Sequence, residues 1–408
     1  MSGTAALKKI SGGVTAAKGF KAASTAAGIK YKDRKDMAMI YSEAPCRSAG
    51  TFTTNVVKAA PVKWDKNQVT GGAAAHAVVI NAGIANACTG EEGMEYCSRT
   101  AATAAQVLGI PQEGVLVAST GVIGKQLPMD RIEAGIKAMA PLLEAGPESG
   151  TAASKAIMTT DTKNKEAAVQ LELGGVLVTI GGMCKGSGMI HPNMCTMLSF
   201  VTTDAAISKE LLQQALSADV QDTYNMISVD GDTSTNDTLY GLANGASGVS
   251  ASDEESLKAL SAALTSVLGD LAYMLVKDGE GASKVARIHV AGAASDADAE
   301  RVARTVGHSQ LVKTALYGRD ANWGRIVAAV GRSGADFNPD DVVVTLCGVE
   351  LFRKGQPTDL DFDALLEEPL KQRDLPIDIV LGSGSGSYTL LASDLGHEYV
   401  NVNADYRS

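Results

Sequence analysis

Apolar and polar residues follow two periods along the chain, which predicts β-strands interspersed with amphipathic helices. Residues 168–173 and 176–180 alternate at a period of two and are joined by Gly174-Gly175, a sequence typical of a β-hairpin turn. Residues 77–80 form a continuous apolar run. A run of this length predicts a strand that is buried on both faces.

The helical period is clearest in residues 131–140, where apolar side chains recur at Ile132, Ile136 and Met139. Pro141 is predicted to end this helix, because proline lacks the N–H that a helix interior requires. Similar patterns predict helices at residues 91–108, 208–217, 252–276 and 295–308. Further strands are predicted at residues 37–41, 51–55, 114–118, 197–203, 286–290, 342–346, 377–381 and 399–402.

A loop rich in glycine and proline lies between two predicted strands, within residues 183–200. Its two glycines and Pro192 require backbone angles outside regular structure, and Thr196 follows directly before the next strand. A threonine in this position can act as a self-cleaving N-terminal nucleophile, because its hydroxyl can attack the carbonyl of Cys195 and open the chain. The released α-amine then serves as the base, with an ordinary pKa of about 7.7–8.0. The alternative is that Thr196 is an ordinary β-branched strand residue beside a tight turn.

Two further short segments are candidates for a site. Thr120-Gly121 follows a predicted strand and can aim one hydroxyl and one backbone N–H at a common point, the minimum for an oxyanion hole. The alternative there is a plain strand-to-helix turn.

Glu280 lies between two glycines, which can present its carboxylate to a cleft, although most glutamates in such turns are simply solvated.

Composition and charge narrow the class of protein. The chain has 408 residues, of which 45% are hydrophobic and 20% charged, enough for one large core or two. The net charge of −10 argues against nucleic acid as a partner, because nucleic-acid binding requires a basic surface. No apolar run reaches about 18 residues, and the N-terminus lacks the apolar core of a signal peptide. Neither a membrane span nor secretion is expected.

The cysteines and histidines indicate neither a disulfide framework nor a metal site. The six cysteines are scattered and form no C-x-x-C pair, which is typical of reduced, buried thiols in a cytoplasmic protein. The five histidines show no ligand spacing. The sequence therefore predicts a cytoplasmic protein without a metal site.

The loop sequence K-G-S-G-M-I-H-P-N-M-C-T-M-L at residues 185–198 resembles the cleavage and nucleophile motif of the ornithine acetyltransferases, also called bifunctional glutamate N-acetyltransferases of arginine biosynthesis. The resemblance covers nearly the whole chain, including S-T-G-V-I-G at residues 119–124, I-M-T-T-D-T at 157–162, S-V-D-G-D-T-S-T-N-D at 228–237 and N-A-D-Y-R at 403–407. It implies an α/β fold with helices layered on β-sheets, of the self-cleaving N-terminal-nucleophile type.

The resemblance also assigns roles to individual residues. Thr196 becomes the nucleophile after cleavage at Cys195, where the family commonly has alanine, and Thr120 and Gly121 stabilise the oxyanion. Substrate-binding roles fall on Thr159, with its neighbour Thr160 as the alternative, and on Lys185, Thr196, Glu280, Asn403 and Ser408. Ser408 stands where the family has threonine and keeps its hydroxyl. Residues 228–237 are interpreted as a buried hydrogen-bonding loop beside the site.

The implied activity is transfer of an acetyl group from N2-acetylornithine to L-glutamate through an acetyl ester on Thr196. The implied mature form is an α-chain of residues 1–195 and a β-chain of residues 196–408, assembled as α2β2. No cofactor is implied, and whether acetyl-CoA is a second acetyl donor is left open. Two other classes are kept as alternatives: an N-terminal-nucleophile aminopeptidase or amidase, which would pass the acyl group to water, and a non-catalytic small-molecule binding protein, which would stay uncleaved.

Overall fold

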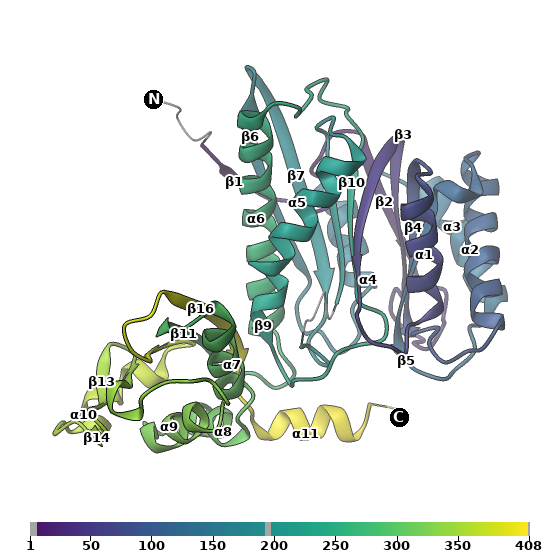
Figure 1. The fold of residues 1–408 in the computed structure, drawn as a ribbon. Coiled ribbons are helices and arrows are strands. Elements are labelled where there is room, and N and C mark those ends of the chain that lie inside the picture. Colours follow the sequence, from purple (N-terminus) through teal and green to yellow (C-terminus); the bar gives the residue numbers. More distant parts are fainter. Residues whose placement is uncertain (1–5, 192–196, 407–408) are drawn as a thin grey trace. The chain divides into compact units, whose positions relative to one another are not determined.

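The protein is represented by a computed structural model that describes residues 6–191 and 197–406. The chain forms two compact units, each with a sheet of its own. The first unit comprises Met1–Gly186, Pro192–Asn225 and Thr233–Leu275, and the second comprises Ser187–His191, Met226–Asp232 and Val276–Ser408. Both units combine helices with a β-sheet (Figure 1), so the expected α/β class with helices layered on sheets is confirmed.

Within the described residues, the first unit is built on a nine-stranded sheet with the order β1-β6-β7-β8-β10-β3-β4-β5, and β2 pairs with β3 off this path. Its strands are β1 (Lys8–Ile10), β2 (Phe20–Thr25), β3 (Met37–Phe52), β4 (Ala75–Ile84), β5 (Val115–Val122), β6 (Lys165–Leu173), β7 (Val176–Lys185), β8 (Leu198–Thr203) and β10 (Thr238–Ala243). Strand β8 pairs antiparallel with β7 and parallel with β10. The strand that follows the glycine- and proline-rich loop therefore lies in the interior of the sheet.

The hairpin that the sequence predicts is confirmed in β6 and β7. These strands pair antiparallel, and Gly174 and Gly175 between them have φ angles of 58° and 81°, which suits a two-residue type I′ turn. The predicted strand at residues 37–41 and the first two residues of the predicted strand at 51–55 belong to one strand, the 16-residue β3, which ends at Phe52. Met37–Tyr41 and Cys46 of β3 pair with β4, with a register shift between Tyr41 and Cys46, and Arg47–Phe52 pair with β10.

The helices of the first unit are α1 (Ala60–Gly71), α2 (Glu92–Leu108), α3 (Met129–Met139), α4 (Pro147–Ala156), α5 (Lys209–Gln221) and most of α6 (Glu254–Lys277). Four of them confirm sequence predictions, with Asp253 capping α6 through a hydrogen bond from the Ser256 N–H at 2.9 Å. Helices α1 and α4 were not predicted. In α4 the buried positions are glycine, alanine and serine, so no large apolar residues mark its period.

Strand β4 is buried on both faces, as predicted. Val78 and Ile80 belong to a core cluster that contains Ala153 of α4. Val79 belongs to a different cluster that contains Ile132 of α3. Side chains alternate along a strand, so these two helices cover opposite faces of the sheet.

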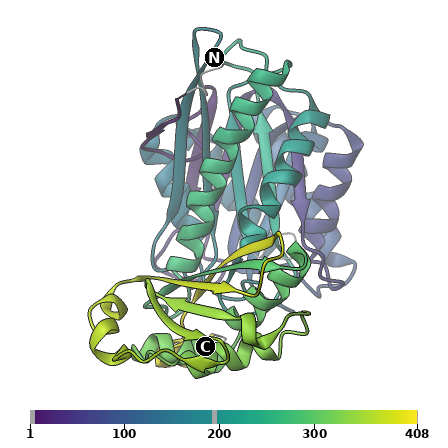
Figure 2. The same cartoon turned by 60° about the vertical axis from the view of Figure 1, so that its left-hand side comes forward.

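Helices α5 and α6 lie along the strands of the first sheet, as both views show (Figures 1 and 2). By length and composition, α6 could cross a membrane, with a mean hydropathy of 1.6 over its most apolar window, of which 50% is buried. Every 18-residue window of α6 contains Asp270, so the expectation that no uninterrupted apolar run reaches about 18 residues holds. Core helices of globular proteins pass the same test, so a single such helix is weak evidence for a membrane span.

In the second unit, the described residues form a seven-stranded sheet with the order β14-β13-β12-β15-β11-β16-β9. Its strands are β9 (Ile227–Ser228), β11 (Val285–Ala293), β12 (Val343–Leu346), β13 (Val349–Arg353), β14 (Gln356–Pro357), β15 (Asp374–Val380) and β16 (Gly386–Ser393). Its helices are α7 (Asp296–Gly307), α8 (Gln310–Gly318), α9 (Trp323–Gly331), α10 (Phe362–Leu366) and α11 (His397–Ala404). The predicted strand and helix between residues 286 and 308 are confirmed as β11 and α7, with Ser295 as the N-cap.

The predicted strand at residues 399–402 is wrong, because these residues lie within helix α11. Side-chain hydrogen bonds support the helix: Asn403 Nδ2 donates to the Tyr399 carbonyl at 2.9 Å, and Asn401 Nδ2 donates to Glu398 Oε2 at 3.0 Å. The strand propensity on which the prediction rested spans only about 1 kcal/mol and depends on context.

The expectation of buried thiols holds for three of the five cysteines among the described residues. Cys46, Cys97 and Cys184 are free and buried, and burial raises the pKa of Cys46 and of Cys184 to about 12. Cys88 is exposed, so the prediction was wrong at that position. Cys88 lies in the loop before α2 and has a φ angle of 56°.

Candidate functional site

Lys185, the last residue of β7, is buried and contacts two other residues predicted for the site. Its Nζ lies 2.8 Å from Thr159 Oγ1 and 3.2 Å from Thr120 Oγ1, both within hydrogen-bonding distance. It also lies 3.8 Å from Asp161 Oδ2. One ammonium group thus joins hydroxyls that come from two separate segments of the chain.

A break in the strand ladder positions Thr120. Ile84 of β4 is paired with both Thr120 and Val122 of β5, a register shift typical of a β-bulge. Gly121 has a φ angle of 130°, and a Cβ at this position would overlap the carbonyl carbon of Gly83. Glycine is therefore required here, and the segment is a bulged strand end rather than the plain turn that was the alternative.

Asn236 ties this bulge to the loop that precedes β10. Its Nδ2 donates to the carbonyl of Ser119 at 2.8 Å and to the carbonyl of Ala85 at 2.6 Å. Ser119 directly precedes Thr120, so Asn236 fixes the backbone that carries the candidate oxyanion donors. The sequence indicated a buried hydrogen-bonding loop here, but it did not single out this residue.

Asp161 is the negative charge that accompanies the buried lysines. Its Oδ1 accepts hydrogen bonds from Lys165 Nζ and from the Gly186 N–H, both at 2.7 Å. Burial by itself would raise the pKa of Asp161, but the positive charges of Lys185 and Lys165 and these hydrogen bonds lower it well below the usual range. Asp161 therefore stays ionised at neutral pH and anchors the chain just after Lys185. Sequence analysis missed it, although it lies in the I-M-T-T-D-T segment.

A second carboxyl, Asp237, lies at the start of β10 and is 1% exposed. Burial raises its pKa well above the usual value, which favours the neutral form. The next residue, Thr238, donates its N–H to the carbonyl of Met197 at 2.9 Å. Asp237 is thus held close to Met197, the first described residue after Thr196.

In the second unit, Glu280 and Asn403 lie in contact. Asn403 Nδ2 donates to Glu280 Oε2 at 2.7 Å, and the Glu280 N–H donates to the carbonyl of Ser187 at 2.8 Å. Glu280 is 9% exposed, so it is not a solvated turn residue. A Cβ at Gly188 would overlap the Glu280 carboxylate, so a larger residue at this position would displace that side chain.

Asp230 links the loop before the predicted cleavage site to helix α11. Its Oδ2 accepts from the Met189 N–H at 2.6 Å, and its Oδ1 accepts from the Ile190 N–H at 2.9 Å. Tyr399 of α11 donates its hydroxyl to Oδ2 at 3.4 Å. Burial is the main cause that raises the pKa of Asp230. Sequence analysis did not identify this residue, because its partners lie far away along the chain.

Three predicted site residues, Cys195, Thr196 and Ser408, lie outside the described residues. The nearest described position is Met197, and Leu198 after it pairs with Lys185 across β7 and β8. Within residues 6–191 and 197–406, no group of three or more His, Cys, Asp or Glu side chains is arranged to hold a metal ion.

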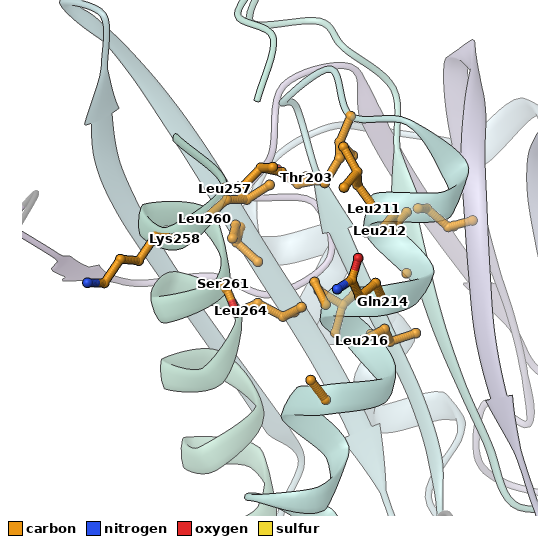
Figure 3. Close-up of a pocket in the computed structure, with 17 residues that line it drawn as sticks. Thr203, Leu211, Leu212, Gln214, Leu216, Leu257, Lys258, Leu260, Ser261 and Leu264 are labelled. Atoms are coloured by element: carbon orange, nitrogen blue, oxygen red, sulfur yellow. The ribbon is translucent and has the colours of Figure 1, made fainter. Parts of the chain in front are cut away.

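An apolar cavity of about 280 Å³ lies between α5 and α6 in the first unit (Figure 3). Leucine is the most frequent residue of its lining: Leu211, Leu212, Leu216, Leu242, Leu257, Leu260 and Leu264. None of the predicted site residues lines it. Such a lining does not suit an amino-acid substrate, which carries charges that require polar partners.

The sequence matches the family described as the ArgJ family over residues 21–408. It is 58% identical to the arginine biosynthesis bifunctional protein ArgJ of Nitratidesulfovibrio vulgaris, over 96% of this chain and 99% of that protein. It is 48% identical to the protein of the same name from Symbiobacterium thermophilum, over 98% of this chain and 99% of that protein. A crystal structure of the arginine biosynthesis bifunctional protein argJ from Bacillus halodurans matches 47% of this chain and 100% of that chain, with 44% identity and a TM-score of 0.45. The chain therefore belongs to the ArgJ family.

Proposed function

We propose that the protein transfers an acetyl group from N2-acetylornithine to L-glutamate through an acetyl ester on Thr196. As a member of the ArgJ family, the protein is an acetyltransferase of arginine biosynthesis. The observation that most supports the finer proposal is the contact of Lys185 Nζ with both Thr120 and Thr159. These residues lie in separate motifs that the sequence resemblance assigns to one reaction.

The first proposed step is self-cleavage. Thr196 Oγ attacks the carbonyl carbon of Cys195, the peptide C–N bond breaks, and an ester forms with a free α-amine on Thr196. Water hydrolyses the ester and leaves an α-chain of residues 1–195 and a β-chain of residues 196–408. The new α-amine, with a pKa near neutrality, is then the base for the same hydroxyl.

The second step is acetyl transfer. The α-amine removes the proton of Thr196 Oγ, which attacks the acetyl carbonyl of N2-acetylornithine. The Thr120 hydroxyl and the Gly121 N–H stabilise the oxyanion, a contribution that commonly amounts to about 3–4 kcal/mol per donor. The C–N bond breaks, ornithine leaves as the protonated amine, and the acetyl ester remains on Thr196. The amine of glutamate then attacks this ester and regenerates the hydroxyl.

The remaining residues bind the substrates in this proposal. Lys185 binds a substrate carboxylate, because its compact ammonium is positioned beside Asp161. Thr159, which contacts the same ammonium, binds the substrate next to it. Glu280 binds the δ-ammonium of ornithine, and Asn403 and Ser408 orient the acetyl acceptor. The protein acts in the cytoplasm as an α2β2 assembly without a metal or cofactor.

Initial rates against both substrates test the mechanism. A ping-pong reaction gives parallel double-reciprocal lines, and a peptide that begins with acetylated Thr196 should be recovered when glutamate is omitted. The Thr196→Ala variant should remain one uncleaved chain on a denaturing gel and be inactive, whereas Thr202→Ala removes a hydroxyl from β8 without affecting the nucleophile. Acetate release at the rate of ornithine release would indicate an amidase instead. Intersecting lines, or a fully active uncleaved enzyme, would contradict the proposal.

A further inference from the structure

A buried pair of polar side chains, Asn81 of β4 and Ser119 of β5, lies beside the bulge that carries the candidate oxyanion donors. The two residues are partners in the parallel ladder, and Ser119 Oγ donates to Asn81 Oδ1 at 2.7 Å. Asn81 Nδ2 donates to the carbonyl of Ile84 at 2.9 Å. Asn81 is 4% exposed and Ser119 is 1% exposed, so both hydrogen bonds are shielded from water.

The chemistry of the partners fixes the orientation of the Asn81 amide. A carbonyl oxygen can only accept, so the amide nitrogen must face Ile84 and the amide oxygen must face Ser119. The Ser119 hydroxyl is therefore the donor of the pair. Asn81→Asp would lose the bond to Ile84, and Asn81→Ala would lose both bonds.

The bond to the Ile84 carbonyl spans the bulge of β4. Gly83 and Ile84 carry the register shift against β5, and the ladder resumes at Ala85, whose N–H donates to the carbonyl of Val122 at 3.0 Å. The Asn81 side chain thus connects the regular part of β4 to the far end of the shift. A β-bulge disrupts the regular ladder, so a side-chain bond of this kind helps to hold it in one conformation.

The pair lies on the opposite face of the sheet from the side chain of Thr120. Side chains alternate along a strand, so Ser119 and Thr120 point to different faces. Val117, two residues before Ser119, belongs to the core cluster that contains residues of α3, whereas Thr120 contacts Lys185. The pair can therefore affect a substrate only through the backbone that follows Ser119.

We propose that Asn81 and Ser119 are positioning residues for acetyl transfer, which hold the two oxyanion donors where the negative charge forms. The inference rests on the proposed function, because it takes Thr120 and Gly121 as those donors. Ser119 is held from two sides, by its hydroxyl on Asn81 and by Asn236 Nδ2 on its carbonyl at 2.8 Å. Donors that stabilise a transition state must be fixed before the reaction, and a displacement of about 1 Å can lower the rate about a hundredfold.

Single-turnover kinetics of the full-length cleaved enzyme test this role. Ser119→Ala removes the hydroxyl of the pair, and Asn81→Ala removes both bonds of the amide. In each variant, release of ornithine from N2-acetylornithine with glutamate omitted should slow about tenfold or more, because the oxyanion donors are displaced. Ser42→Ala is the control, because it removes an equally buried hydroxyl from β3, and it should leave this rate unchanged.

Calorimetry with ornithine shows whether each variant keeps a folded site. Ornithine has no acetyl carbonyl, so its Kd should stay unchanged in Ser119→Ala and Asn81→Ala. The stoichiometry gives the fraction of folded sites, to which the rates are normalised. Ser119→Ala decides alone if Asn81→Ala does not fold, because it deletes a single buried oxygen.

A double-variant cycle identifies the group through which the pair acts. If Ser119 acts by positioning Thr120, the rate of Ser119→Ala/Thr120→Ala should fall by less than the product of the two single losses, because a missing donor cannot be misplaced. Losses that multiply would show that the pair acts elsewhere and would overturn the inference.

Three other results would also overturn it. Ser119→Ala could release ornithine at the wild-type rate per folded site, its Kd for ornithine could rise by the factor by which the rate falls, or Ser42→Ala could slow release equally. In each of these cases the wild-type enzyme still releases ornithine, and the proposed function is unaffected. Failure of the wild-type enzyme to release ornithine without glutamate would instead contradict the proposed function.

Discussion

Asn403 and Glu280, which are separated by 123 positions in the sequence, are joined by a hydrogen bond of 2.7 Å from Asn403 Nδ2 to Glu280 Oε2. Asn403 lies in the last helix, α11, and also donates to the Tyr399 carbonyl in the turn before it. Its amide is therefore held in place from two sides. A carboxylate oriented in this way is suited to bind one cationic group of a substrate.

Replacement of Asn403 by alanine should lower kcat/KM for acetyl transfer. The loss of transition-state stabilisation should be about 1–3 kcal/mol, the range of one lost hydrogen bond to a charged group. The cause is a Glu280 carboxylate that loses its orienting donor. Asn401→Ala is the control, because Asn401 lies on the same helix and contacts the exposed Glu398 instead. Steady-state rates with both substrates give the measurement. Wild-type kcat/KM in Asn403→Ala would show that the pair does not serve catalysis.

Replacement of Asp161 by asparagine should destabilise the protein at pH 7 by about 3–5 kcal/mol, because Lys165 and Lys185 would remain buried without their counter-charge. The folded pKa of Asp161 lies below its unfolded value of about 3.9. Its charge therefore stabilises the fold above that value, and the contribution is lost as the pH falls through the folded pKa. The penalty of Asp161→Asn should accordingly stay constant from pH 7 down to about pH 4 and begin to shrink between about pH 4 and pH 3.

Urea unfolding of wild-type protein and Asp161→Asn at several pH values gives the free energies. Asp130→Asn is the control, because this residue lies exposed in the first turn of α3. A penalty that stays the same between pH 7 and pH 3 would mean that the charge of Asp161 does not stabilise the buried lysines.

Replacement of Asp230 by alanine should slow self-cleavage by about tenfold or more, because the Met189 and Ile190 N–H groups would lose the acceptor that orders the loop before Cys195. Asp230→Asn keeps an oxygen acceptor and should have a smaller effect. Intact-mass spectrometry after synthesis follows the cleaved fraction over time. Asp232→Ala, in the same loop, is the control. Equal cleavage rates in wild-type protein and Asp230→Ala would exclude this role.

The elements with a clear period could be predicted from the sequence, and those without it could not. Gly174-Gly175 between two alternating runs identified the hairpin, and the apolar run at residues 77–80 identified β4 as a doubly buried strand. Helix α4 was not predicted, because its buried residues are small and show no apolar period. Residues 399–402 were assigned to a strand from propensity, whereas local side-chain hydrogen bonds support a helix.

Sequence-based prediction was more limited still for the residues of the candidate site. Lys185, Thr120 and Thr159 were assigned through resemblance, and the structure brings them together. Asp161, Asp230 and Asn236 were missed, because what distinguishes them is the position of partners up to 151 residues away. Any buried carboxylate or amide in a polar loop has the same local sequence signal. Only the folded chain shows which backbone groups it holds.

The strand order of the first sheet has a consequence for a cleaved molecule. Strands β8 and β10 follow residue 196 in the chain, whereas their outer neighbours β7 and β3 precede residue 195. After cleavage, strands of the β-chain would be interleaved between two groups of strands of the α-chain. The uncut chain can refold alone, but the two separated fragments must find each other, so recovery from urea should depend on protein concentration. The mature enzyme would then persist because it unfolds slowly, not because it refolds readily.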